Sequence, residues 1–246
     1  MKKILICILC LTVTRSFGQF RLGVTGGATT ANLWQTDGYT GVPTGLSSWP
    51  ITGFTGGLIA EIDLNSSGLM IQPSLSYYVY GSHLANSTGF PSGNVIIDYS
   101  NTMLYIYSLR LPVNLVYKFS ITDKWKVFAG IGPYVAKALS GTEKGYYKGY
   151  YTASDGSYVG VGVQINNKAK LSTDLSNAPA GITNINPYDV GGNVLLGLEY
   201  KKFQFAINYS RGFTKVYRSS YANTGNFAWN FSLAYMIFGH NKKPAL

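Results

Sequence analysis

Hydrophobic and polar residues alternate with a period of two along most of the chain, and no helical period persists. The segment Leu109–Phe119, LRLPVNLVYKF, is typical: apolar or aromatic residues occupy every second position, while Arg110, Asn114 and Lys118 stand between them. This is the pattern of a β-strand whose two faces meet different environments. Eight segments have it, within residues 20–25, 54–63, 69–79, 109–119, 127–139, 190–200, 203–210 and 227–237. The sequence therefore predicts an all-β protein of eight strands.

The connections between these segments are short and long in strict alternation. Three are tight turns, at residues 64–68, 120–124 and 201–202, and four are long, at residues 33–50, 83–100, 140–187 and 215–225. Bacterial outer-membrane barrels have this arrangement. We therefore predict an eight-stranded antiparallel transmembrane β-barrel with short periplasmic turns and long extracellular loops, of which the third, about residues 140–187, is the longest.

The size of the apolar side chains decides between a membrane barrel and a soluble one. A soluble β-sandwich or lipocalin turns its apolar face inward and carries charges outside at ordinary abundance. Here 12% of the residues are charged and 15% are aromatic. An eight-stranded barrel has room inside only for packed side chains. The aromatic residues would overpack that space, so we expect them to face lipid.

Residues 1–18 have the features of a secretory signal peptide. Two lysines precede an apolar run at residues 4–13, and small residues lead to a cleavage site between Gly18 and Gln19. The run is too short for a membrane anchor, which needs ~20 residues as a helix. A lipoprotein site at Cys7 or Cys10 is disfavoured because a bulky residue precedes each cysteine. We expect a signal peptide at 1–18, the barrel at 19–240 and a periplasmic tail at 241–246, in the cell outer membrane.

Export also limits the expected chemistry. Both cysteines lie within the predicted signal peptide, so the mature chain is expected to have no disulfide, thiolate nucleophile or cysteine metal site. The formal charge falls from +10 to +7 with the signal peptide, and the remaining lysines are scattered, so nucleic-acid binding is not expected. The loop carboxylates are dispersed without the spacing of metal ligands. We expect neither a metal nor a cofactor.

Charged residues stand on the polar face of several predicted strands. If the leucines of the segment Leu109–Phe119 face lipid, Arg110 faces the lumen, and the same parity places Arg21, Glu61 and Glu199 there, with Lys118 beside them. A buried guanidinium without partners is costly. We predict that Arg21 and Arg110 pair with Glu61 and Glu199 in a polar network that fills the lumen and leaves no wide aqueous channel.

The positions of the prolines and of the aromatic residues lead to two further predictions. Pro73, Pro112 and Pro133 lie inside strands of a sheet that has no edge, so we expect β-bulges there. Tyrosine and tryptophan side chains are expected to form a girdle at each membrane surface. The expected members are Tyr77, Tyr78, Tyr80, Tyr105 and Tyr107 near the outer rim, and Trp125, Tyr200 and Tyr235 near the inner one.

Four stretches carry a resemblance to a known family: LRLPVNLVYKF, FAGIGPYVAKAL, YDVGGNVLLGLEY and the closing FSLAYMIF. With them, almost the whole mature chain resembles the PorT-like outer-membrane β-barrel family of Bacteroidota. The resemblance implies an eight-stranded barrel. Members of that family include a component of a protein-secretion and gliding apparatus, and many whose role is unknown. No catalytic residue carries over, and the chain departs from PorT by its long third loop.

The third loop contains the best candidate for recognition. Its tyrosines and lysines could hold a sugar, a peptide or a partner by stacking and cation–π contact. These residues are Lys144, Tyr146, Tyr147, Lys148, Tyr150 and Tyr151. The stretch SYVGVGVQI alternates like a strand, which favours a strand pair that projects beyond the membrane and whose tyrosines only fill its surface. The two interpretations are compatible.

Three functions remain for such a barrel. We expect a non-enzymatic protein that acts in binding or assembly through its extracellular loops, for example as an accessory subunit of a secretion or surface complex. Its partners would be outer-membrane lipid and lipopolysaccharide, and proteins of that complex. The alternative is a narrow channel for small solutes. The third is an outer-membrane hydrolase or acyltransferase, for which His83, Asp98 and Ser100 are the available catalytic group.

Overall fold

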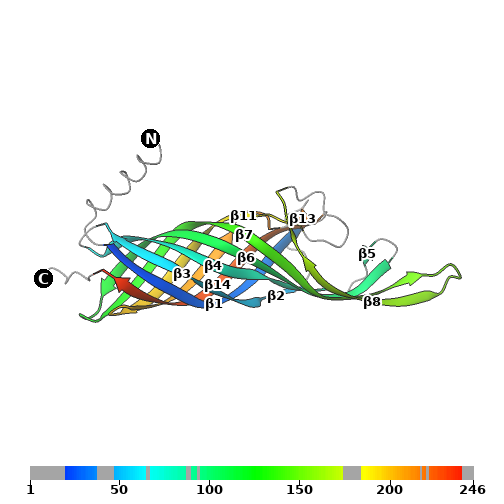
Figure 1. The fold of residues 1–246 in the computed structure, drawn as a ribbon, viewed down its shortest axis with the longest axis horizontal. Coiled ribbons are helices and arrows are strands. Elements are labelled where there is room, and N and C mark those ends of the chain that lie inside the picture. The colour runs from blue at the N-terminus through cyan, green and yellow to red at the C-terminus, as the bar shows by residue number, and fades with distance from the viewer. Residues whose placement is uncertain are drawn as a thin grey trace.

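Eight long antiparallel strands form a closed ring in the computed structural model of the protein (Figure 1). Each long strand pairs with the next one along the chain, and the last pairs with the first. The eight are β1 (Phe20–Asp37), β3 (Ile51–Asp63), β4 (Leu69–Asn86), β6 (Val95–Ser120), β7 (Trp125–Thr152), β11 (Tyr188–Tyr200), β12 (Phe203–Gly212) and β14 (Ala222–Phe238). The predicted eight-stranded antiparallel barrel is confirmed.

Six further strands in the described part of the chain are not members of the ring. They are β2 (Ser47–Trp49), β5 (Phe90–Ser92), β8 (Tyr158–Lys168), β9 (Lys170–Leu171), β10 (Asn184–Ile185) and β13 (Arg218–Ser219). The structure describes residues 20–37, 47–64, 67–86, 90–92, 95–173, 184–216, 218–219 and 222–239, so the predicted signal peptide and the tail at 241–246 lie outside it. Within these ranges no helix has the length and apolar character to cross a membrane.

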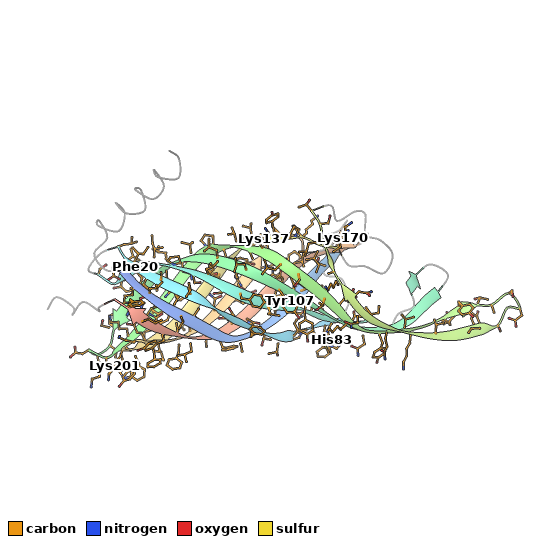
Figure 2. The ribbon with its side chains drawn as sticks, in the orientation of Figure 1. Phe20, His83, Tyr107, Lys137, Lys170 and Lys201 are labelled. Carbon is orange, nitrogen blue, oxygen red and sulfur yellow. The ribbon has the colours of Figure 1, made fainter. Side chains whose placement is uncertain are left out.

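The two ends of the barrel differ in their connections. The turns at residues 64–68, 121–124 and 201–202 gather at one end, here called the turn end, where Figure 2 shows Phe20 and Lys201. At the opposite end, the hairpin end, β7 and β8 run on together well beyond the ring (Figure 1). An even number of strands brings the start of β1 and the end of β14 to the turn end, which is the arrangement that bacterial barrels share.

The strands at the hairpin end are longer than the alternation predicted. β4 and β6 stay paired as far as Asn86 and Ser100, and β7 continues to Thr152. Much of residues 83–100 and 140–187, expected as loops, is therefore strand. Backbone hydrogen bonds can extend a ladder where side chains no longer meet lipid, so the ladder outlasts the apolar alternation.

Side chains sort by parity between the lumen and the outer surface. On β6, Arg110, Asn114 and Lys118 are buried, whereas Leu111 and Leu115 are exposed. The other long strands likewise present Phe, Leu, Ile, Val, Trp or Tyr outward. Large apolar side chains on the outside of a closed barrel are the lipid-facing surface of a membrane protein.

Aromatic pairs mark both rims of the apolar band. Trp125 stacks near Tyr200 at 4.6 Å between ring centroids at the turn end, and Tyr77 lies 6.4 Å from Tyr107 towards the hairpin end. The prediction of the outer girdle is wrong for two of its members, however. Tyr78 and Tyr80 are 5% and 4% exposed and lie inside the barrel, because they have the opposite parity to Tyr77.

The three strand prolines produce gaps in the ladders rather than bulges. Pairing of β4 with β6 stops after Pro73–Val113 and resumes at Ser76–Arg110 in the same register, and β6 with β7 skips from Pro112–Tyr134 to Leu115–Ile131. The β6–β7 register shifts lie elsewhere, at residues 97–99 and 107–108. The predicted bulges are wrong: each proline removes one donor, and the flanking hydrogen bonds hold the register.

Candidate functional site

Four charged side chains meet inside the barrel near its turn end; we call them the charge cluster. Arg21 donates to Glu199 through Nη1 at 3.1 Å and through Nη2 at 2.7 Å, and it also contacts Glu61. Lys118 lies 2.6 Å from Glu61 Oε1 and contacts Glu199 as well. Both carboxylates are 1% exposed. Two cations thus face two anions in a closed arrangement that satisfies the demand of buried charge for partners.

Two glutamines complete the charge cluster. Gln204 Nε2 donates to Glu61 Oε1 at 2.9 Å and to Glu199 Oε2 at 2.8 Å, and Gln72 Nε2 donates to Glu61 Oε1 at 2.9 Å. Lys126 approaches Glu199 more loosely, at 3.8 Å. The four charges and two glutamines come from β1, β3, β4, β6, β11 and β12. Six of the eight strands therefore contribute to one network across the lumen.

Arg110 does not belong to this network, and its predicted pairing with Glu61 and Glu199 is wrong. Arg110 stands eight residues from Lys118 along β6. At ~3.3 Å per residue this is about 26 Å along the strand, beyond the reach of an arginine side chain. Parity correctly placed Arg110 inside the barrel, but parity does not give the level along the strand. Lys118 occupies the position in the charge cluster that was predicted for Arg110.

Arg110 lies instead between two tyrosine rings. Its Cζ is 3.6 Å from the Tyr134 ring centroid and 4.6 Å from that of Tyr78, and Nη1 donates to Ser210 Oγ at 3.2 Å. The Tyr134 hydroxyl donates to Asp189 at 2.8 Å. We call Arg110, Tyr78 and Tyr134 the arginine stack. Its geometry is that of cation–π contact, which the neighbouring aromatic rings make favourable away from water.

Asp189 accepts a hydrogen bond from Tyr134 of the arginine stack and is a buried carboxylate that the sequence analysis did not single out. Asn226 Nδ2 donates to it at 2.6 Å, and Thr214 and Tyr134 donate too. Its carboxylate is therefore held by three neutral donors and makes no ion pair with Arg110 among the described contacts. The parity of Tyr134 within the Gly-Pro-Tyr stretch was the signal that could have placed this ring inside.

Glycines on neighbouring strands make room for the inward aromatic rings. Tyr134 pairs with Gly191, and Phe128 pairs with Gly197. A Cβ at either glycine would meet the ring opposite. The ring of Tyr134 therefore lies flat over a bare stretch of backbone, which fixes its position against Arg110.

A matched pair of glycine variants tests this packing. We expect Gly191→Ala to displace Tyr134 and to lower the free energy of unfolding by about 1–3 kcal/mol, because the added methyl group overpacks the lumen and the Tyr134 hydrogen bond is lost. Gly192→Ala is the control, since the nearest heavy atom to a Cβ there is 3.5 Å away. Urea titration of the protein in lipid vesicles measures both. Equal losses would contradict the role given to Gly191.

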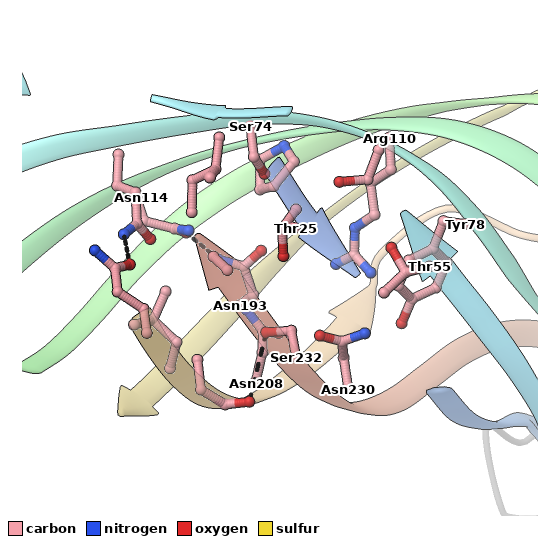
Figure 3. Close-up of a pocket in the computed structure, with 18 of the residues that line it drawn as sticks. Thr25, Thr55, Ser74, Tyr78, Arg110, Asn114, Asn193, Asn208, Asn230 and Ser232 are labelled. Carbon is pink, nitrogen blue, oxygen red and sulfur yellow. Dashed lines mark hydrogen bonds between the residues drawn. The ribbon is translucent and has the colours of Figure 1, made fainter. Parts of the chain in front are cut away.

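An apolar cluster fills the lumen on the hairpin side of the arginine stack. It contains Leu33, Tyr80, Leu104, Ile106, Ala138, Ile185 and Val216, all buried. The lumen was expected to be polar; it holds buried polar side chains along its length together with this apolar cluster and a second one of Met70, Val116, Phe128 and Leu195. Between the charge cluster and the apolar cluster lies a cavity of about 90 Å³ lined by Arg110 and by amide and hydroxyl groups (Figure 3).

The β7–β8 hairpin has two different faces. Lys144, Tyr146, Lys148 and Tyr150 alternate on one face, which we call the tyrosine–lysine face. Lys148 Nζ lies 5.7 Å from the Tyr146 ring centroid, and Tyr150 meets Tyr158 edge to face at 5.1 Å. The structure thus brings together four of the six residues singled out in this segment.

The other two candidates lie at positions of the opposite parity. Tyr151 is exposed and pairs with Val159. Tyr147 pairs with Val163, and its side chain lies outside the described part of the structure. At the hairpin tip, hydrogen bonds from the Ser157 hydroxyl at 2.6 Å and the Ser157 amide at 2.9 Å hold the pKa of Asp155 below its usual value. These bonds order the turn.

Glycines form the floor of the tyrosine–lysine face. Gly160 pairs with Tyr150, and Gly162 pairs with Lys148. No heavy atom lies within 4 Å of a Cβ placed at either glycine, so the space above them is open. Tyr158, which is 74% exposed, bounds this space on one side. Aromatic and cationic side chains around bare backbone provide a flat surface on which a sugar ring or an extended peptide can lie.

Comparison with known proteins settles the family. A model described as "Outer membrane protein beta-barrel domain" matches residues 14–218. The chain belongs to this family. It is an outer-membrane β-barrel, and its outward apolar face contacts the lipid of that membrane. By the shared orientation of such barrels, the turn end is periplasmic and the hairpin end is extracellular.

Solved structures of small outer-membrane proteins are similar to this barrel. OprG from Pseudomonas aeruginosa is 10% identical, with 90% of this chain and 97% of that chain covered and a TM-score of 0.48. Ail from Yersinia pestis is 11% identical, with 89% and 100% covered and a TM-score of 0.35. The protease OmpT from Escherichia coli is 11% identical, with 90% and 98% covered and a TM-score of 0.42. No curated protein matches the sequence.

The barrel gives little support to the group His83, Asp98 and Ser100. His83 pairs with Met103, whereas Ser100 pairs with Asn86, three positions further along the ladder. The His83 imidazole contacts the Asn101 side-chain oxygen. The side chains of Asp98 and Ser100 lie outside the described part of the structure. Among the described residues, no three His, Cys, Asp or Glu side chains gather as metal ligands.

Proposed function

We propose that this barrel is a non-enzymatic binding protein of the cell surface, in which the β7–β8 hairpin holds the partner. The observation that carries the proposal is the tyrosine–lysine face, which stands beyond the barrel on a rigid strand pair. Binding residues concentrate on such exposed segments positioned by a rigid scaffold. The charge cluster, which bridges six strands across the lumen, supports the same conclusion, because the extracellular surface is then the place where this barrel meets other molecules.

The partner we propose is a protein subunit of a secretion or surface complex. The resemblance of the barrel strands to PorT-like proteins of Bacteroidota supports this, since that family includes a component of such an apparatus. The chemistry of the face adds to it: exposed tyrosines and lysines with a glycine floor suit an extended, acidic or aromatic segment of a partner. Lipopolysaccharide then contacts the barrel as a membrane component rather than as its ligand.

Filling the glycine floor is the sharpest test. In a Gly160→Val, Gly162→Val variant, two methyl-bearing side chains occupy the open space, and valine suits a strand better than glycine. We expect the hairpin to stay folded and partner binding to weaken on the order of tenfold or more, as for loss of a central contact. Tagged protein is recovered from detergent-solubilised outer membranes, its partner is identified and purified, and Kd is measured for both forms.

Two controls make the outcome decisive. Val163→Leu adds bulk at an exposed position of the opposite parity and should leave Kd unchanged. A shortened hairpin, in which Asn-Gly replaces residues 145–165 between the paired Lys144 and Asn166, should release the partner altogether. If the partner still binds both the variant with the filled glycine floor and the variant with the shortened hairpin, its binding site lies elsewhere on the barrel. Recovery of the barrel alone in every form would reject the assembly role.

A further inference from the structure

We propose that the lumen holds a small monovalent anion, of the halide type, against Arg110. The guanidinium is 6% exposed and makes no ion pair among the described residues. The Arg21 guanidinium, in contrast, is held by two carboxylates. A buried cation is expensive unless an opposite charge accompanies it, so the arginine stack is incomplete without an anion.

Two nitrogens of the guanidinium are available to such an anion. Nη1 donates to Ser210, while Nε and Nη2 are buried and have no hydrogen-bond partner. The Arg110 Cζ lies over both tyrosine rings, so Nε and Nη2 are the donors that remain for an anion. Figure 3 shows Arg110 reaching into the cavity, with Thr55 and Asn230 at the same end. Buried donors without partners mark the place of an ion or an ordered water.

The lining of the cavity favours an anion over a cation or an apolar molecule. Arg110 is the only charged residue among the described residues that line it. Hydroxyl groups in the lining, such as those of Thr25, Thr55, Ser74 and Ser76, can donate a hydrogen bond to an anion, whereas the amides of Gln72 and Gln204 already donate to the charge cluster. Asp189 does not line the cavity, because its carboxylate accepts hydrogen bonds from Tyr134 and Asn226 instead.

The size of the cavity selects the class of anion. A volume of about 90 Å³ corresponds to roughly three water molecules at liquid density. A halide ion with one or two waters fits this space, whereas a sugar acid or a hydrated sulfate does not. The charge cluster and the apolar cluster flank the cavity along the lumen, so an anion here would be a resident of the barrel rather than a substrate in transit.

Anion-dependent stability tests the site. The unfolding temperature of the barrel in detergent is measured in sodium chloride, sodium bromide and sodium gluconate at equal ionic strength. We expect chloride and bromide, but not bulky gluconate, to raise it by about 3–6 °C at ten times the apparent Kd. The rise should disappear in Arg110→Met. Lys126→Met removes the same charge outside the cavity lining and should keep the rise.

A second variant and a direct observation cover the case in which Arg110→Met does not fold. Ala206→Leu keeps the arginine and fills the cavity, which Ala206 lines, so it should also abolish the halide effect. In crystals soaked in sodium bromide, an anomalous peak should lie within hydrogen-bond distance of Arg110. Equal stability in all three salts, or water alone at the guanidinium in molar bromide, would overturn the proposal.

Discussion

Replacing Glu199 by alanine should lower the free energy of unfolding of the barrel by about 3–5 kcal/mol, the cost of removing one partner from a buried ion pair. The charge cluster would then hold Arg21 and Lys118 against Glu61 alone. One cation would be left without a carboxylate at a site where Glu199 is 1% exposed. Urea titration of the protein in lipid vesicles, followed by tryptophan fluorescence, measures the loss.

The matched double variant separates charge balance from lost volume. In Glu199→Met, Lys118→Met one charge of each sign is removed, and Arg21 keeps Glu61 as its partner. Apolar replacement of a whole buried pair is often close to neutral, so most of the stability should return. A double variant that is as unstable as Glu199→Ala would show that the charges are not the reason for the loss.

An arginine at Val113 should cost about 2–4 kcal/mol, as for a charge at the middle of the lipid-facing surface. Val113 is exposed on β6, six residues from Tyr107 on one side and six from Phe119 on the other. Its side chain therefore points into the centre of the apolar band. The free energy of unfolding in lipid vesicles is again the measured quantity.

Depth is the variable that the control changes. Ile121 is 58% exposed in the turn after β6, so Ile121→Arg places the same charge beyond the band, where about 0–1 kcal/mol is expected. The two variants add the same side chain to the same strand and its turn. A similar cost for both would mean that the face carrying Val113 does not lie in the hydrocarbon.

The barrel itself could be predicted from sequence because lipid imposes a local rule. Most outward positions of a spanning strand are apolar, so the alternation of Leu109, Leu111, Val113 and Leu115 appears directly in the sequence. The projecting β7–β8 pair was predictable from the strand-like alternation in SYVGVGVQI. Strand ends were not, because beyond the membrane the ladder continues without an apolar requirement.

The lumen was harder to predict because parity gives only the face of a strand. It placed Arg21, Glu61, Arg110 and Glu199 inside, and the structure buries all four. Which of them meet depends on strand tilt and register, and these are properties of the closed ring. Lys118 and Arg110 therefore could not be told apart as partners of the carboxylates.

The inward aromatic rings show the limit of a volume argument. A general overpacking rule placed tyrosines outside, yet Tyr78, Tyr80 and Tyr134 are inside. Tyr134 fits because Gly191 stands opposite it. Local complementarity of that kind involves residues far apart in the chain, and it becomes visible only once the register is known.

The charge cluster also bears on how the barrel is made. Arg21 stands at the start of the first strand, and Glu199 follows it by 178 residues, near the end of β11. A chain that has reached only β7 already contains Arg21, Lys118 and Glu61, and therefore has a surplus cation in its lumen. The second carboxylate, Glu199, joins the charge cluster only when β11 is added to the sheet. A barrel that lacks β11 thus has an unpaired cation in its charge cluster, and the charges of this cluster balance only once the ring is complete.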